Sequence, residues 1–577
     1  MNWQMIGVFT LFFLAVTTLG FWAARWRPGD LNRLQEWGLA GRRFGSLVSW
    51  FLIGGDMYTA YTFMAVPALI FAQGAQGFFA IPSFTLMYPI ALVFMPRFWT
   101  IARHRGYLTS ADFVRERFDS KTLALLVAVT GILATMPYVA VQIYGMQLVL
   151  AQMGVPVELA LFIAFLLLAA YTYISGLRGP ALIAMVKDIS IWIITLVAII
   201  SLSTRLGGFE RIFAVVPQRQ VLLAPEQYST YATLILGSAL PLFLYPHALT
   251  GVLSTNSRKV VKRTAAFLLA YTLLQGLLGL LGFVAIAAGV QSSSMYQTNA
   301  ALPALLAGMF PSWFVGFAFS AIAIGALVPA GIMSIGAAHL FTRSIYREYF
   351  RPTCTEREES NVAKTVSLFV KAGALAFVLF FPTTFAINLQ LFGNVWMLQT
   401  LPAVFLGLYT RWFHRLALII GWAAGMLTGT WMVVTQNFMS VYPLSFGGIT
   451  IPVYAALAAV IVNLLVCLML TPIFRALGIA AGQDMTSPAD YEPQPVAGFE
   501  RPVQSGAHWP GAQLQPQVQR VEVVPSGRGY IPAVPAAPSP LPPAPTPATQ
   551  QSNLQGQPLP SPSPEPGARV LRKTRMI

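Results

Sequence analysis

The sequence predicts an all-α, polytopic membrane protein with about 13 transmembrane helices, and two observations support this prediction. Only 10% of the 577 residues are charged and 56% are hydrophobic, whereas a soluble globular chain carries about 25% charged residues. Many windows also reach the roughly 20 apolar residues that one helix needs to cross a bilayer core. The alternating apolar pattern of a transmembrane β-barrel is missing, so helices are the expected spanning elements.

Thirteen apolar segments lie within residues 1–479, which we expect to form one transmembrane domain. The segments are 5–24, 45–70, 77–98, 122–152, 157–176, 180–203, 228–251, 262–290, 308–342, 363–383, 385–409, 414–436 and 449–474. The first segment has no basic residue before it, while Arg25 and Arg27 follow it. This is the reverse of a secretory signal, so we expect a retained helix.

Arginine and lysine residues concentrate in alternate loops between these segments. The basic connections are 25–44, 99–121, 252–263, 343–362 and the turn at 411–415, and loop 204–227 is an exception. The positive-inside rule therefore places the N-terminus outside and the C-terminus in the cytoplasm of a bacterial inner membrane. These loops explain the net charge of +16, so the expected partner is the lipid bilayer and not nucleic acid. The oligomeric state stays open.

Residues 480–577 differ in composition from the rest of the chain. Proline-rich stretches such as 532–543 cannot build a core, so we expect a disordered cytoplasmic tail with some polyproline II structure. The tail ends in a basic cluster from Arg569 to Arg575. That cluster fits a solvated tail, and it also fits a contact with anionic lipid or a partner protein.

Asp56 is an acidic residue near the middle of the second apolar segment, where a charge is costly and commonly functional. Gly54 and Gly55 precede it and weaken the helix. A broken helix exposes carbonyl groups and helix ends that suit a cation or an anionic substrate. The alternative is an aspartate that simply pairs with a neighbouring helix.

The seventh segment is interrupted in the same way, by Gly237, Pro241 and the sequence Tyr245-Pro-His247. Disturbed helices in corresponding positions predict an inverted-repeat transporter with its site at the midplane. The expected repeats are about 45–203 and 228–409. His247 suits a carboxylate ligand or a proton, and it also fits a capped histidine in a kinked helix.

Other residues in the spans have less specific patterns. Lys187 and Asp188 stand at the start of the sixth segment, where an ion path and local pairing both fit. A lone serine such as Ser334 usually bonds its own helix backbone. A stripe of small residues in the twelfth segment indicates helix packing, and it consists of Gly421, Gly425 and Gly429.

Several functional motifs are absent from the sequence. It contains no phosphate-binding loop of the Gly-x4-Gly-Lys-Ser/Thr type and no His-Glu-x-x-His pair. We therefore do not expect an enzyme or an ATP-driven pump, and we expect no organic cofactor.

Four stretches of the chain together resemble the sodium:solute symporter family over about residues 5–474. They are Leu39-Ala-Gly-Arg-Arg43 with the run into Asp56, Leu108-Thr-Ser-Ala-Asp-Phe-Val-Arg-Glu-Arg-Phe118, Gly176-Leu-Arg-Gly-Pro180 with Lys187-Asp188, and Met333-Ser334. The sequence is most similar to monocarboxylate permeases within that family, partly through Leu244-Tyr-Pro-His247.

The resemblance implies a thirteen-helix protein with the leucine-transporter-type five-plus-five inverted repeat. Its cation site would lie between the second and ninth helices. The implied ligands are the carbonyls of Gly54, Met57 and Gly331 and the hydroxyl of Ser334. Asp56 and Asp188 match acids that act in coupling and on the ion path.

Ile335 departs from the family pattern, because many sodium-coupled members have Ser or Thr there. Isoleucine cannot bind an ion, so a sodium site would have lost one oxygen. Water or Asp56 could replace it, or Asp56 could carry a proton because burial favours the neutral carboxyl. The coupling ion is therefore Na⁺ or H⁺.

The expected function is secondary active uptake of a small monocarboxylate of the pyruvate, lactate, acetate and propionate class. The candidate substrate residues are Tyr58, Thr59, Tyr245 and His247. The alternatives are a symporter for proline, another amino acid or pantothenate, and a transporter-shaped nutrient sensor that signals through its tail.

Overall fold

The computed structural model describes residues 2–26, 28–291, 298–380 and 386–493, and most of them are helical. Nine helices in this part of the chain are long and apolar enough to cross a membrane, or ten if a bent pair at 388–409 counts as one span. The nine are Trp3–Trp22 (α1), Tyr61–Arg105, Lys121–Gln152 (α7), Arg178–Arg205 (α9), Arg258–Ala287, Ser312–Phe350, Glu356–Phe380 (α18), Arg415–Thr435 (α21) and Ala455–Ala476 (α22). The polytopic helical class is confirmed, whereas the number thirteen stays a prediction.

The second apolar segment is broken directly after Gly54 and Gly55, as these glycines led us to expect. Helix α3 (Ser46–Gly55) ends at the second glycine, and residues 56–59 are not in a regular helix. The chain then continues as the π-helical turn η3 (Tyr61–Ala65) and helix α4 (Val66–Gln73). The break lies within a buried part of the fold, so its polar groups need partners from other elements.

The seventh segment is also broken into two short helices. Helix α12 (Tyr228–Ala239) ends before a turn, and helix α13 (Pro246–Leu253) begins at a proline in its first position. Proline fits there because the first amide of a helix has no partner within the helix. Both predicted interruptions are therefore present. Helices α3, α12 and α13 have 10, 12 and 8 residues, so none of them alone is long enough to cross a membrane.

Helix α17 (Ser312–Phe341) forms the centre of the fold, and 94% of its most apolar window is buried. It packs against α1, α7, α9, α13 and α18. A Cβ atom on Gly336 would lie 2.7 Å from the carbonyl carbon of Pro246, so glycine lets α13 approach its backbone. Such close approach of small residues is a usual way to pack helices in membranes.

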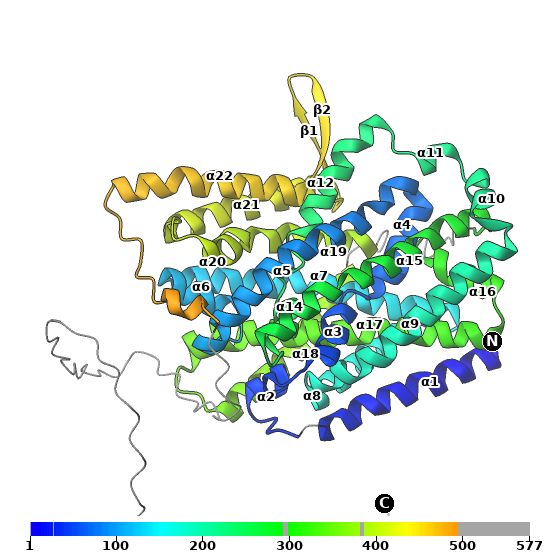
Figure 1. Ribbon diagram of the computed structural model, residues 1–577, viewed down its shortest axis with the longest axis horizontal. Coiled ribbons are helices and arrows are strands. Elements are labelled where there is room, and N and C mark those ends of the chain that lie inside the picture. Colours follow the sequence, from blue (N-terminus) through cyan, green and yellow to red (C-terminus); the bar gives the residue numbers. More distant parts are fainter. Residues whose placement is uncertain (1, 27, 292–297, 381–385, 494–577) are drawn as a thin grey trace, which may run out of the picture. The chain divides into compact units, whose positions relative to one another are not determined.

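Further helices complete the bundle. They are α5 (Ala80–Arg105), α8 (Val157–Ser175), α14 (Arg258–Phe267), α15 (Leu269–Ala287), α16 (Ala301–Met309), α19 (Ala386–Met397) and α20 (Gly407–Tyr409). Short helices in the connections are α2 (Leu34–Leu39), α6 (Ser110–Phe118), α10 (Gly208–Val215) and α11 (Gln218–Val221). An antiparallel hairpin of β1 (Val441–Phe446) and β2 (Ile449–Tyr454) projects from the helices (Figure 1).

Helices α21 and α22 lie side by side (Figure 1), and the glycine stripe of α21 faces α22. A Cβ atom on Gly421 would lie 2.3 Å from the sulfur of Cys467, and one on Gly429 would lie 3.0 Å from Cβ of Ala459. The prediction that this stripe serves packing is confirmed.

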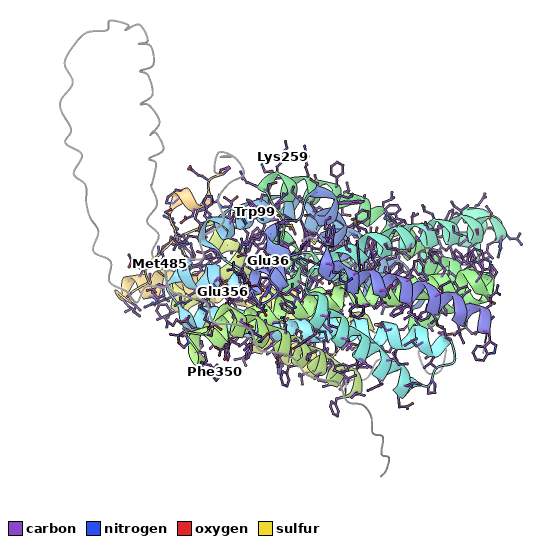
Figure 2. The ribbon with its side chains drawn as sticks, turned by 90° about the horizontal axis from the view of Figure 1, so that it is seen from below. Glu36, Trp99, Lys259, Phe350, Glu356 and Met485 are labelled. Atoms are coloured by element: carbon purple, nitrogen blue, oxygen red, sulfur yellow. The ribbon has the colours of Figure 1, made fainter. Side chains whose placement is uncertain are left out.

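The basic loops meet at one end of the bundle. Arg33 pairs with Glu356 at 3.0 Å and Arg115 pairs with Glu348 at 3.1 Å, which links three of these loops. Figure 2 labels residues from four of them in the same half of the bundle, namely Glu36, Trp99, Lys259, Phe350 and Glu356. The N-terminus of α1 lies at the other end (Figure 1).

Residues just after 479 contact this basic end. Asp484 pairs with Arg117 at 3.1 Å and with Arg411 at 3.0 Å. The ring of Tyr491 lies 4.9 Å from the guanidinium carbon of Arg97. These contacts correct the prediction that the chain is disordered from residue 480 onward. The rest of the predicted tail, with its basic end, lies outside the described residues.

Candidate functional site

Asp56 and His247 meet between the two broken spans. Asp56 follows the last residue of α3, His247 lies in the first turn of α13, and Asp56 Oδ2 is 3.4 Å from His247 Nε2. Their side chains are 11% and 3% exposed. Asp56 Oδ1 and His247 Nδ1 are buried without a hydrogen-bond partner in the described part of the chain. Buried polar atoms normally have partners, so these two are available to a ligand.

A cavity of about 30 Å³ opens beside this pair. Its lining is mostly apolar and consists of Ile53, Asp56, Met57, Phe84, Met87, Met95, Tyr138, Leu242, His247, Ala248 and Leu268. One water molecule needs about 10–15 Å³ measured in this way, so the space holds two or three. A ligand here would be small, with a short apolar body and a polar group directed at the Asp56–His247 pair.

Two tyrosines pack around the imidazole of His247. The ring centres of Tyr138 and Tyr245 lie 5.4 Å and 5.0 Å from that of His247. The hydroxyl of Tyr245 donates a hydrogen bond to Asn394 Oδ1 at 3.0 Å. Tyr245 is therefore held by α19 and fixes the position of His247, whereas Tyr138 reaches the cavity itself.

A second polar cluster joins the same break to α9 and α15. The ammonium of Lys187 donates to the carbonyl oxygens of Gly55 and Tyr58, the latter at 3.0 Å. It also pairs with Asp188 Oδ1 at 3.1 Å, and Asp188 Oδ2 accepts a hydrogen bond from the hydroxyl of Tyr271 at 2.7 Å. Both charged side chains are 0% exposed, so this is an ion pair fully enclosed by protein.

The four predicted substrate residues are divided between these two places. His247 lines the cavity, and Tyr245 contacts its ring. Tyr58 belongs to the second cluster, where its hydroxyl donates to the carbonyl of Tyr271 at 3.1 Å. Thr59 Oγ1 accepts a hydrogen bond from the amide of Tyr61 at 3.1 Å. Neither Tyr58 nor Thr59 is among the residues that line the cavity.

The predicted cation ligands of the break have partners within their own segments. The Gly54 carbonyl accepts a hydrogen bond from the amide of Met57 at 2.9 Å, and the Met57 carbonyl accepts one from Thr62 Oγ1 at 2.5 Å.

The predicted ligands of the ninth span lie on helix α17. Ser334 donates to the carbonyl of Ala330 at 2.6 Å, as expected of a serine in a membrane helix. Gly331 and Ile335 are buried in the same helix. The four cation ligands stay a prediction.

Two residues beside the break have no role in the sequence analysis, and the partners of a third were not foreseen. Tyr138 lines the cavity and Gln142 accepts a hydrogen bond from the amide of Ala60 at 3.0 Å. Lys187, expected on an ion path or in a local pair, also binds two backbone carbonyls. A signal was present, because each is a polar residue inside an apolar segment. The partners could not be identified from sequence, since they come from elements far away along the chain.

Comparison with known proteins identifies the family. Residues 37–429 match the sodium:solute symporter family. The chain belongs to this family. The symporter is 47% identical over 483 residues to a protein of Rhizobium johnstonii named "Monocarboxylate transport permease protein", covering 82% of this chain and 98% of that one. It is 34% identical to the uncharacterized symporter YodF of Bacillus subtilis, covering 80% and 92% of the two chains.

Two solved structures show the fold of the symporter. A Na⁺-coupled sialic acid symporter in a substrate-bound, outward-open state has a TM-score of 0.68 at 16% identity, covering 82% of this chain and 98% of that one. Mhp1, a nucleobase-cation-symport-1 family transporter, has a TM-score of 0.50 at 12% identity, covering 80% and 98%. These likenesses confirm the predicted leucine-transporter-type fold.

Proposed function

We propose that this symporter takes up a small monocarboxylate, of the size of pyruvate, lactate, acetate or propionate, together with a cation. The observation that carries the proposal is the small apolar cavity beside His247 and Asp56. The cavity has room for a ligand of a few heavy atoms, and its mostly apolar walls suit a short carbon chain. The 47% identical relative named as a monocarboxylate permease supports the same substrate class.

His247 supplies the recognition of the carboxylate in this proposal. An imidazole that carries its proton on Nδ1 donates from that atom and accepts at Nε2. Nε2 faces Asp56, whose carboxyl can donate to it when it carries a proton, and Nδ1–H, which has no protein partner in the described residues, serves the substrate.

The proposed orientation in the membrane rests on the placement of the basic loops. They share one end of the bundle, and the N-terminus of α1 lies at the other. By the positive-inside rule the basic end faces the cytoplasm and the N-terminus lies outside, in a bacterial inner membrane. If one monocarboxylate moves with one monovalent cation, the step carries no net charge. The membrane potential would then not drive uptake at this stoichiometry.

Uptake of labelled pyruvate into proteoliposomes tests the proposal. One set has an imposed sodium gradient and the other a pH gradient, at the same membrane potential. We expect saturable uptake that unlabelled lactate or acetate inhibits and proline or pantothenate does not. Uptake of labelled proline or pantothenate in the same vesicles, with no uptake of pyruvate, would replace the monocarboxylate with those substrates.

Variants connect transport to the proposed site. Asp56→Asn and His247→Ala should each reduce uptake strongly. His339→Ala is a matched control, because His339 is also buried, in α17, but does not line the cavity. If both site variants transport like the control, the assignment of the site is wrong.

A further inference from the structure

Lys187 is held at the break of the second span by three oxygen atoms. Its ammonium donates hydrogen bonds to the carbonyl oxygens of Gly55 and Tyr58 and forms an ion pair with the carboxylate of Asp188. The side chain is 0% exposed. The break therefore holds a buried cation that belongs to the protein.

The ammonium of Lys187 lies at the C-terminal end of helix α3, a position that favours positive charge. Helix α3 ends at Gly55, and the last carbonyls of a helix have no partners within it. The C-terminal end of a helix also carries roughly half a negative charge. In transporters with broken helices, such carbonyls and helix ends coordinate the coupling ion. Lys187 thus occupies a place of the kind that a coupling ion takes.

The two glycines and Tyr271 shape the site around Lys187 and Asp188. A Cβ atom on Gly55 would lie 3.0 Å from Asp188 Oδ2 and 3.3 Å from Lys187 Nζ. One on Gly54 would lie 2.2 Å from the ring of Tyr271, whose hydroxyl holds Asp188 at 2.7 Å. The glycines leave the room that the ion pair fills, so the cluster fits the break closely.

We propose that Lys187 is a tethered cation: its ammonium fills the carbonyl site at the end of α3, and this site binds no sodium ion in this protein. A sodium ion there would need the same two carbonyls and the same carboxylate oxygen, and the ammonium would repel it. If the protein is the proposed symporter, the ammonium takes the place of one sodium ion in the transport cycle. This consequence for coupling rests on the proposed function. Asp56, which also faces the break, interacts electrostatically with Lys187.

Removal of the ammonium should create a sodium site. Lys187→Ala leaves the carbonyls of Gly55 and Tyr58 and an unpaired Asp188 carboxylate around an open space. These are hard oxygen ligands that suit a small cation. A lysine that only capped the end of α3 would leave no such preference for sodium.

Equilibrium binding of ²²Na⁺ to the purified full-length protein measures this directly. We expect Lys187→Ala to bind one more sodium ion per protein than the wild type, and Lys187→Arg, which keeps the charge, to bind the wild-type number. Lys371→Ala is the matched control, because Lys371 is also fully buried and bonds the Ser367 carbonyl of its own helix at 3.1 Å. It should bind the wild-type number. An unchanged sodium count in Lys187→Ala would overturn the proposal.

Folding of the variant gives a second test in the same preparation. Lys187→Ala should be monodisperse in sodium buffer and less stable when potassium replaces sodium, since sodium fills the vacated site. Aggregation in both buffers would show a structural lysine and also overturn the proposal. Sodium binding is measured without substrate, so a failure of pyruvate uptake would reject the proposed function without changing this result.

Discussion

Gly54→Ala tests the packing of the break against α15. The new methyl group would lie 2.2 Å from two carbons of the Tyr271 ring, at a distance where ordinary contacts are 3.4–4 Å. The ring must move by more than 1 Å, and its hydroxyl then leaves Asp188, which it contacts at 2.7 Å. Overpacking costs about 1–3 kcal/mol. A lost hydrogen bond to a charged group costs about 1.5–3 kcal/mol.

We therefore expect Gly54→Ala to destabilise the protein by about 2.5–6 kcal/mol. Thermal unfolding in detergent, followed by intrinsic fluorescence, should show a lower midpoint, and pyruvate counterflow should fall. Gly276→Ala is the matched control on α15, because no atom lies within 4 Å of its Cβ position. That change should stabilise slightly, since alanine favours helix. Wild-type unfolding and counterflow in Gly54→Ala would refute the described packing.

Two further predictions concern the basic end of the bundle. Asp484→Asn removes the carboxylate shared by Arg117 and Arg411, so proteolysis after residue 480 should become faster, while unchanged cleavage would contradict a docked segment. Burial and the neighbouring Glu116 raise the pKa of Tyr107, so its contribution to stability is present below pH 10 and is lost as pH rises above about 10. Tyr107→Phe should flatten the alkaline fall in unfolding midpoint, and an equal fall in both proteins would contradict this.

Local backbone chemistry made both broken spans predictable from the sequence. Gly54 and Gly55 end α3, and Pro246 begins α13, because glycine weakens a helix and proline suits a first turn. The bond of Ser334 to its own helix was also expected from residue type. Family resemblance supplied the fold class, which the structural comparisons confirm.

Contacts between distant elements could not be predicted in this way. Asp56 and His247 were singled out separately, but their pairing depends on how α13 packs beside α3. The same applies to Lys187, whose ligands are carbonyls with no side-chain signature. Composition indicated disorder from residue 480, whereas Asp484 forms ion pairs with Arg117 and Arg411. Composition could not predict these ion pairs, because they depend on which elements lie close together in three dimensions.

The half-saturation concentration for pyruvate counterflow in His247→Ala tests whether the cavity beside His247 binds the substrate carboxylate. Loss of a hydrogen bond to a charged group costs about 1.5–3 kcal/mol, which corresponds to roughly a 10- to 150-fold weaker interaction. We predict a shift of that size in His247→Ala and none in His339→Ala. Equal half-saturation in the wild type and His247→Ala would contradict the claim that this cavity binds the carboxylate.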